Sequence, residues 1–263
     1  MRKTKPGFGS ALIIALVSVY LVLPLLLTFV YSLFTEWTNL VPTGFTLGFY
    51  AQILSDRSFL LALLRTMVIS VVPVLVCLAA VLLAMYVIVV YHPEWEKYMQ
   101  VLCTIPYALQ GIILAISILS LYSGAPQPFS NRFFLLTGTY CVVVLPYMYR
   151  GIRNSLNTLN APQLIQAAQL LGASRIQAYW RVVVPNIRKG VVVSALLGMA
   201  LLFGDFAIVN TIGGSYYETA QMHLYRILFR SGQLSSAVIL VLFFATLVLS
   251  GIVFWLNRKG KEE

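Results

Sequence analysis

The chain has 263 residues, of which 60% are hydrophobic and 10% are charged, and its mean hydropathy is +0.87. A single soluble core could not hide that much apolar surface, so the composition excludes an ordinary soluble enzyme and indicates a bilayer protein. The formal net charge of +10 would suit nucleic acid, but no soluble stretch is large enough to carry a folded basic module.

Six long apolar runs follow one another along the chain. Each approaches the roughly 20 residues that a membrane-spanning helix needs, and each is continuous rather than alternating, which favours helices over a β-barrel. We therefore predict an all-α membrane protein with a single transmembrane domain over residues 1–263. The six spans are expected near Phe8–Leu33, Leu60–Val90, Thr104–Tyr122, Phe133–Tyr149, Val191–Ile212 and Ala237–Leu256.

The basic residues set the orientation of these spans. The first run is too long to be only a signal-peptide core and no A-x-A-like cleavage site follows it, so we expect it to stay as an anchor. Most of the 18 Lys and Arg residues then fall on the side of the two termini. The other side holds Arg57, Arg132, Arg226 and Arg230. The positive-inside rule therefore places both termini, and residues 151–189, in the cytoplasm.

Residues 151–189 form the longest polar region and lie between the fourth and fifth predicted spans. Asn160 is a candidate N-cap and Pro162 suits a first helical turn, so a helix is predicted to begin here. The spacing divides this helix into two faces. Gln163, Gln166 and Gln169 lie on the polar face, and Leu164, Ala168 and Leu171 lie on the apolar face.

A second helix is predicted to follow at once. Gly172 would stop the first helix, Ser174 would cap the second, and Pro185 would end it. Its expected apolar side holds Ile176, Tyr179, Trp180 and Val183, and its polar side holds Arg175, Gln177 and Arg181. Two interpretations fit this mixed surface: a docking site for a protein partner, or a helix pair lying in the headgroup region of the bilayer.

The same stretch resembles the cytoplasmic EAA motif of permease subunits in binding-protein-dependent ATP-binding-cassette importers. That motif reads E-A-A, three residues, G, nine residues, I-x-L-P. The corresponding residues here, at the same spacing, are Gln166, Ala167, Ala168, Gly172, Val182, Val184 and Pro185. Gln166 replaces the glutamate and removes one negative charge. The similarity extends to Pro106–Gly111, to Leu145–Pro146 and to FGDFAIVNTIGG at 203–214.

The resemblance implies a fold, a function and a set of partners. It implies six transmembrane helices with both termini in the cytoplasm and a coupling helix, between helices four and five, that contacts an ATPase. The chain would be a multi-pass permease subunit of a bacterial cytoplasmic (inner) membrane and would form half of the pathway for a small polar solute. Its partners would be a second permease, identical or paralogous, two ATP-binding subunits and an extracytoplasmic solute-binding protein. The coupling residues would be Gln166, Ala167, Ala168, Gly172, Ala173, Arg175 and Pro185.

The sequence lacks the common motifs for binding ATP, for binding a metal and for proteolysis. No GxxxxGK[ST] sequence occurs, so we expect this chain to hold no cofactor, with ATP and Mg used by the partner ATPase. The cysteines lack CxxC spacing and no metal site is expected. No protease signature such as GxSG or HExxH is present, which argues against an enzyme. A secondary transporter or channel that does not use ATP is the alternative.

Asp205 is the carboxylate that falls inside a predicted span, past the midplane toward the outside. A charge at such a depth costs roughly 3 kcal/mol on insertion scales, which makes it a functional hypothesis by default. One interpretation is a pathway or gate residue that contacts a polar or cationic substrate, together with Asn210. The other is a structural ion pair with an arginine of a partner subunit, such as Arg65 in a second copy.

The outer end of the fifth span and the nature of the solute complete the predictions. Gly213 and Gly214 are expected to end that span, so that residues 215–232 would face the solute-binding protein, or their tyrosines would form an interfacial belt. The FGDF and GG pattern resembles the branch of the family that handles ferric iron, phosphonates such as 2-aminoethylphosphonate, thiamine and polyamines. The solute within that branch is left open.

Overall fold

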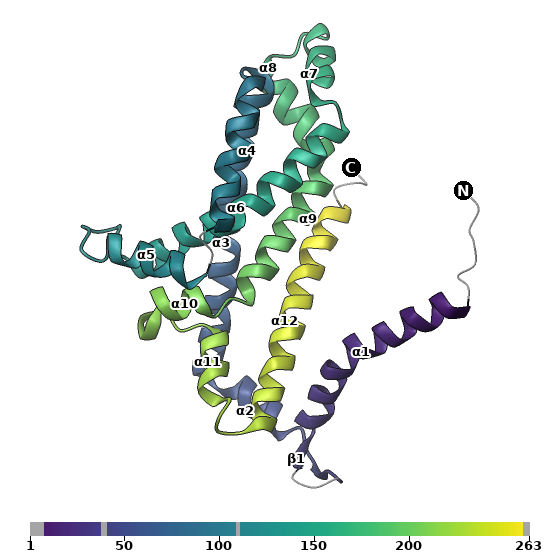
Figure 1. Ribbon diagram of the computed structural model, residues 1–263, viewed down its shortest axis with the longest axis vertical. Coiled ribbons are helices and arrows are strands. Elements are labelled where there is room, and N and C mark those ends of the chain that lie inside the picture. Colours follow the sequence, from purple (N-terminus) through teal and green to yellow (C-terminus); the bar gives the residue numbers. More distant parts are fainter. Residues whose placement is uncertain (1–7, 38–40, 109–110, 260–263) are drawn as a thin grey trace. The chain divides into compact units, whose positions relative to one another are not determined.

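The computed structural model describes residues 8–37, 41–108 and 111–259 (Figure 1). Most of these residues are helical, and their contacts divide them into two units. One unit holds the residues up to Leu60 together with His223–Phe244, and the other holds Leu61–Met222 together with the residues from Ala245 onward. The basic residues Arg2, Lys3, Lys5 and Lys261, which the orientation prediction uses, lie outside the described residues.

The first predicted span is confirmed as helix α1 (Phe8–Ser32), which contains Pro24. None of the residues from Leu12 to Tyr31 is buried inside the chain, although Ser32 at the end of the helix is. A helix that is apolar on all sides is suited to contact with lipid or with another membrane helix.

A short β-hairpin, which the sequence pattern does not predict, follows α1. Strand β1 (Phe34–Glu36) pairs antiparallel with β2 (Thr43–Phe45), and the rings of Phe34 and Phe45 meet edge to face with centroids 6.2 Å apart. Helix α2 (Gly48–Ser55) comes next. Apart from this hairpin, the regular structure in the described residues is helical.

Helices α3 (Arg57–Val90) and α6 (Arg132–Thr158) confirm the second and fourth predicted spans. α6 continues past Tyr149, where its prediction ended, because a helix need not stop where its apolar run stops. Its last turns carry Arg150 and Arg153, polar residues that suit a helix end outside the hydrocarbon region.

The third predicted span, Thr104–Tyr122, is not one straight helix. A 3-10 turn η1 (Pro93–Trp95), α4 (Glu96–Thr104) and a second 3-10 turn η2 (Ile105–Ala108) precede α5 (Ile112–Tyr122), and the two halves meet at 99°. Pro106 cannot donate a helical hydrogen bond, and Gly111 has φ 72°, a conformation that favours glycine. The described residues therefore contain five helices long and apolar enough to span, or six if this bent pair counts as one.

The predicted fifth span is wrong at its start. The helical stretch begins at Arg175 and runs through α8 (Arg175–Ala178), a π-helical turn η3 (Tyr179–Val183) and α9 (Val184–Phe203). Pro185 was expected to end a helix, yet the chain stays helical through it. The wider π turn accommodates a residue that cannot donate the usual bond. The Val184 N–H bonds to the Tyr179 carbonyl, and the Asn186 side chain donates to the Val182 carbonyl at 2.8 Å.

The predicted end of that span is also wrong. α9 ends at Phe203, and the short helix α10 (Ala207–Ile212) follows a break at Asp205. Gly213 and Gly214 do follow the end of α10, as predicted. The elements that follow are the 3-10 turn η4 (Gly214–Tyr216), α11 (Ala220–Ile227) and α12 (Gly232–Lys259), which contains the sixth predicted span.

Helices α6 and α9 run side by side and share the most extensive contact of any two described elements (Figure 1). Two glycine–serine contacts, each with the glycine on one helix and the serine on the other, permit this close approach. A Cβ on Gly151 of α6 would collide with the Ser194 hydroxyl of α9, and a Cβ on Gly190 of α9 would collide with the Ser155 hydroxyl of α6. Small residues at such a crossing let two membrane helices approach closely.

Candidate functional sites

The helix pair predicted from the sequence is present. Helix α7 (Ala161–Leu170) follows α6 directly, and α8 leads through η3 into α9, so both ends of the 161–185 segment continue into long apolar helices (Figure 1). The cap predicted at Asn160 is wrong. Asn160 adopts a left-handed conformation with φ 49°, and its side chain makes no capping hydrogen bond.

Gly172 ends α7 in the way that the sequence predicts. Its φ of 87° lies in the left-handed region, its N–H donates to the Gln169 carbonyl at 2.9 Å, and the Ala173 N–H donates to the Ala168 carbonyl at 3.1 Å. These two bonds form a Schellman motif, which satisfies carbonyls that the helix end would otherwise leave free. The reversal of the chain is therefore fixed by local hydrogen bonds.

Ser174 begins α8 as a capping box. Its hydroxyl accepts from the Gln177 N–H at 3.3 Å, and the Gln177 side chain accepts from the Ser174 N–H at 3.1 Å. A cap of this kind contributes about 1 kcal/mol to a helix. Two helix ends are thus defined within three residues, which gives the tip of the segment one backbone conformation.

The faces of the two helices agree with the prediction only in part. The three glutamines of α7 are exposed and Ala168 is buried, as expected. Leu171 was expected on the apolar face, but it is 90% exposed because α7 has already ended before it. On the second helix Tyr179 and Val183 are buried, whereas Ile176 and Trp180 are exposed.

Leu170 and Leu171 form an apolar knob at the tip of the segment. Their side chains are 89% and 90% exposed, beside the glycine turn. Large apolar side chains exposed next to each other on a rigid turn favour a partner surface that covers them. The sequence pattern missed this knob because it assigned Leu171 to the buried face.

The other predicted coupling residues surround this tip without forming a pocket. Gln166, Ala167 and Pro185 are exposed, and Ala173 is half-buried. Arg175 is exposed, with its guanidinium carbon 5.5 Å from the ring centroid of Tyr91, just past the end of α3. The set therefore presents a surface, as a docking interface would, and its side chains do not converge on one point.

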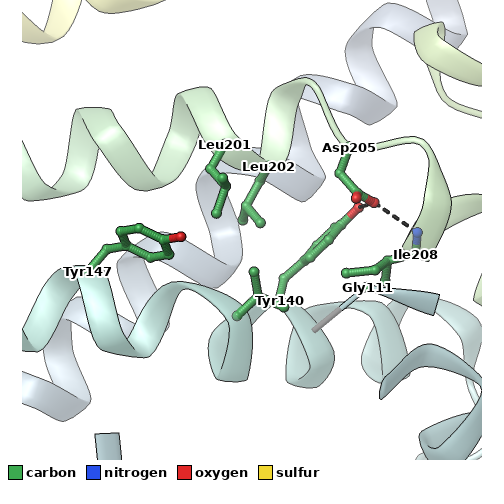
Figure 2. Close-up of a pocket in the computed structure, with 8 residues that line it drawn as sticks. Gly111, Tyr140, Tyr147, Leu201, Leu202, Asp205 and Ile208 are labelled. Carbon is green, nitrogen blue, oxygen red and sulfur yellow. Dashed lines mark hydrogen bonds between the residues drawn. The ribbon is translucent and has the colours of Figure 1, made fainter. Parts of the chain in front are cut away.

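A cavity of about 290 Å³ lies beside Asp205, in the second unit (Figure 2). Its walls come from α6, α9, α10 and the start of α5. The lining residues are Gly111, Tyr140, Val143, Tyr147, Leu201, Leu202, Asp205 and Ile208. A cavity that combines aliphatic side chains with one carboxylate and two phenols has the composition of a small-ligand site.

Asp205 fixes the break between α9 and α10. Its Oδ2 accepts hydrogen bonds from the Tyr140 hydroxyl at 2.9 Å and from the Ile208 N–H at 3.0 Å (Figure 2). It also accepts from the Val209 N–H at 3.4 Å. The carboxylate therefore caps α10 and joins it to α6. Sequence reasoning missed Tyr140, although a tyrosine in an apolar run needs a partner for its hydroxyl when buried.

The structure does not bring Asp205 and Asn210 into one site. Asn210 is exposed and is not among the residues that line the cavity. The sequence suggested Arg65 of a second copy as an ion-pair partner of Asp205. In this chain, the Arg65 guanidinium carbon lies 5.9 Å from the ring centroid of Tyr217. The three bonds to Oδ2 give Asp205 a role that neither sequence interpretation included, which is to hold a helix break.

Comparison with known proteins identifies the relatives of this chain. The family described as "Binding-protein-dependent transport system inner membrane component" matches residues 41–261. A sulfate transport system permease protein, CysW of Synechocystis sp., is 29% identical over 216 residues, which cover 78% of this chain and 75% of that protein. The family match includes the 161–185 segment and the Asp205 break.

Two further relatives are named for other solutes. A putative 2-aminoethylphosphonate transport system permease protein, PhnV of Salmonella choleraesuis, is 22% identical over 246 residues, or 92% of each chain. A spermidine/putrescine transport system permease protein PotC homolog of Mycoplasma genitalium is 25% identical over 181 residues, or 68% of this chain and 62% of that protein.

Proposed function

Because the chain belongs to the family of binding-protein-dependent transport system inner membrane components, we propose that it forms half of a solute pathway that a separate ATPase drives. It is a multi-pass inner-membrane permease subunit of an ATP-binding-cassette importer. The family favours a transport subunit over an enzyme, and it favours this function over a carrier or channel that does not use ATP.

The 161–185 segment is the proposed contact with the ATPase. The single observation that carries this proposal is the apolar knob of Leu170 and Leu171, exposed beside a turn that local hydrogen bonds fix. Apolar side chains on a preorganised turn bind a partner groove at low entropic cost. The exposed Gln166, Ala167 and Arg175 would complete the interface.

The proposed assembly contains a second permease, identical or paralogous, two ATP-binding subunits and an extracytoplasmic solute-binding protein. The described residues of one permease contain five helices that could span, or six with the bent pair, which is a small number for a complete solute pathway. ATP and Mg would be bound by the ATPase partners. This chain would contribute no cofactor of its own.

The cavity beside Asp205 is the proposed section of the solute pathway. All three hydrogen bonds to this carboxylate go to Oδ2, so Oδ1 is the oxygen that could meet a polar or cationic group. Asn210 would lie further along the pathway. The relatives are named for sulfate, an aminophosphonate and polyamines, of which sulfate is outside the branch named from the sequence, so we propose only a small polar solute.

A paired substitution tests the ATPase contact. In the Leu170→Gln/Leu171→Gln protein, we expect the amount of ATP-binding subunit that co-purifies with the permease to fall about tenfold, because the removed side chains would be central anchors. The matched control is Leu121→Gln, which makes the same change at a leucine that is 73% exposed at the end of α5. Equal co-purification from the two proteins would refute the proposed contact.

A further inference from the structure

Helix α3 is hydrogen-bonded to the base of the 161–185 segment. The Tyr179 hydroxyl, in η3, donates to the Leu82 carbonyl at 2.9 Å, and the Tyr179 side chain is fully buried. Its ring also packs on Tyr86 of α3, with centroids 5.1 Å apart. A buried hydroxyl bonded to a main-chain carbonyl fixes the position of η3 along α3, because losing the bond would leave the donor unsatisfied.

The opposite part of α3 is hydrogen-bonded to the segment that follows α10. The Ala220 N–H donates to the Thr66 hydroxyl oxygen at 2.9 Å, and both residues are buried. The Tyr217 hydroxyl donates to the Arg65 carbonyl at 3.2 Å. The outer segment Gly214–Ala220 is therefore attached to one turn of α3 by two bonds.

The two attachment points lie on one helix. Leu82 and Thr66 are separated by about 24 Å at the rise of an α-helix, which is most of the thickness of a bilayer's hydrocarbon core. Pro73 lies between them and interrupts the helical bonding, but the Cys141 thiol of α6 contacts the Pro73 carbonyl at 3.4 Å. α6 thus contacts α3 at this proline.

We propose that α3 transmits movement of the 161–185 segment to the outer segment Gly214–Ala220, with Tyr179 and Thr66 as the positioning residues at its two ends. The inference rests on the proposed function, because it is the ATPase that would move the 161–185 segment. A helix that holds a cytoplasmic element at one end and an outer element at the other makes the position of each depend on the other.

The test measures the outer segment while the ATPase acts on the opposite side. Ser215 is exposed in the outer segment, so a Ser215→Cys permease, purified with its ATPase subunits and reconstituted, is labelled with a membrane-impermeant maleimide. The labelling rate is compared without nucleotide and with ATP plus vanadate. The protein without this substitution corrects for the native cysteines. We expect trapping to change the rate about fivefold, and no change would overturn the proposal.

Two substitutions each remove one of these hydrogen bonds: the Tyr179–Leu82 bond at one end of α3, and the Ala220–Thr66 bond, which is one of two, at the other. Tyr179→Phe deletes the hydroxyl and keeps the ring, and Thr66→Val deletes the hydroxyl and keeps the shape. We expect each to reduce the ATP-dependent change to less than about twofold while ATP hydrolysis continues. Thr66→Ser keeps the hydroxyl and should restore the full change. If Tyr179→Phe does not assemble, the difference between Val and Ser at position 66 decides the question.

Matched controls remove hydroxyl groups that do not join α3 to another element. Tyr86→Phe removes an exposed contact with the Tyr91 hydroxyl, and Thr137→Val removes a bond within α6. Both variants, made in the Ser215→Cys permease, should show the same ATP-dependent change in labelling rate as that permease. If the controls lose the response as much as Tyr179→Phe and Thr66→Val do, the two attachments have no special role and the proposal is wrong.

The double variant tests whether the two ends act through one helix. Sites this far apart normally have additive effects. If α3 connects the two ends in series, the ATP-dependent change in labelling rate of Tyr179→Phe/Thr66→Val should be no smaller than that of the more impaired single variant. A loss equal to the product of the two single losses would contradict the connection. Failure of the ATPase contact itself is read separately, from co-purification with the Leu170→Gln/Leu171→Gln protein.

Discussion

Two breaks in the helical chain, at Gly172 and at Asp205, can be compared bond by bond. At Gly172 the bonds connect residues within five positions of one another, from Ala168 to Gln177. At Asp205 two bonds are local, but the third comes from Tyr140 on another long helix. The first break ends in exposed leucines, and the second lines a cavity.

This difference shows that the Gly172 break is a surface turn, whereas the Asp205 break is part of the packing between helices. A turn fixed by its own neighbours can present a stable surface without support from the rest of the bundle, which suits a site that docks a partner. A break fixed by a distant helix depends on the packing of that helix. Substitutions at the Gly172 break should therefore change transport more than stability, and substitutions at the Asp205 break should change stability.

The largest effect is expected at the Asp205 break. Asp205→Ala leaves three donors without their shared acceptor, and we expect the free energy of unfolding of the purified permease to fall by about 3 kcal/mol. Tyr140→Phe removes one of the three bonds and should lower it by about 1 kcal/mol. Thermal unfolding measures both. Should Asp205→Ala leave the stability unchanged, whatever its effect on uptake, Asp205 would not hold the break.

The α6–α9 crossing should give the next largest effect. Gly151→Ala places a methyl group against Ser194, and overpacking of this kind costs about 2 kcal/mol. Adding Ser194→Gly should recover part of that loss in the same unfolding measurement. Gly138→Ala, in α6 with open space around it, is the control and should be nearly neutral. Equal destabilisation by the two alanine variants would argue against the close crossing.

Gly172→Leu tests the first break. The left-handed conformation costs a residue with a β-carbon about 1 kcal/mol, while the space around Gly172 is open. We expect a small change in stability but a large loss of solute uptake per ATP hydrolysed, because the knob is displaced. Gly172→Asn, which tolerates the left-handed conformation, should retain uptake. Normal uptake in Gly172→Leu would refute a role of the turn in coupling.

The smallest effect is expected from Gln177→Ala, which breaks one half of the capping box at Ser174. The cost should be about 0.5 kcal/mol and confined to α8. Hydrogen exchange of the α8 amides should quicken, while the unfolding temperature of the permease stays constant. If Gln177→Ala lowered the unfolding temperature of the permease as much as Tyr140→Phe does, the two breaks would not be stabilised differently.

The sequence predicted features that depend on neighbouring residues. The first, second, fourth and sixth spans, the stop at Gly172 and the cap at Ser174 follow from apolar length and turn chemistry, and the structure contains them. The predictions from the sequence were wrong where the outcome depends on the conformation of another turn or helix. Pro185 was expected to stop a helix, but the π turn before it absorbs the proline.

The Asp205 break and the bent third span were missed for related reasons. An apolar run shows that a segment is buried but not that it is continuous, so the runs at Thr104–Tyr122 and Val191–Ile212 both concealed interruptions. Asp205 was identified from its charge alone. Its role in holding the break depends on Tyr140, whose position next to it comes from the packing of α6 against α9 and α10.

Photo-crosslinking from the knob tests the central claim most directly. A benzoylphenylalanine residue is placed at Leu171, which is 90% exposed, and in a second protein at Tyr216, which is 78% exposed in the outer segment. After irradiation of membranes that contain the whole importer, the account predicts an adduct between the permease and the ATP-binding subunit from position 171 and none from position 216. If position 171 gave only lipid adducts, or if both positions gave the same product, the claim that this segment contacts the ATPase would be contradicted.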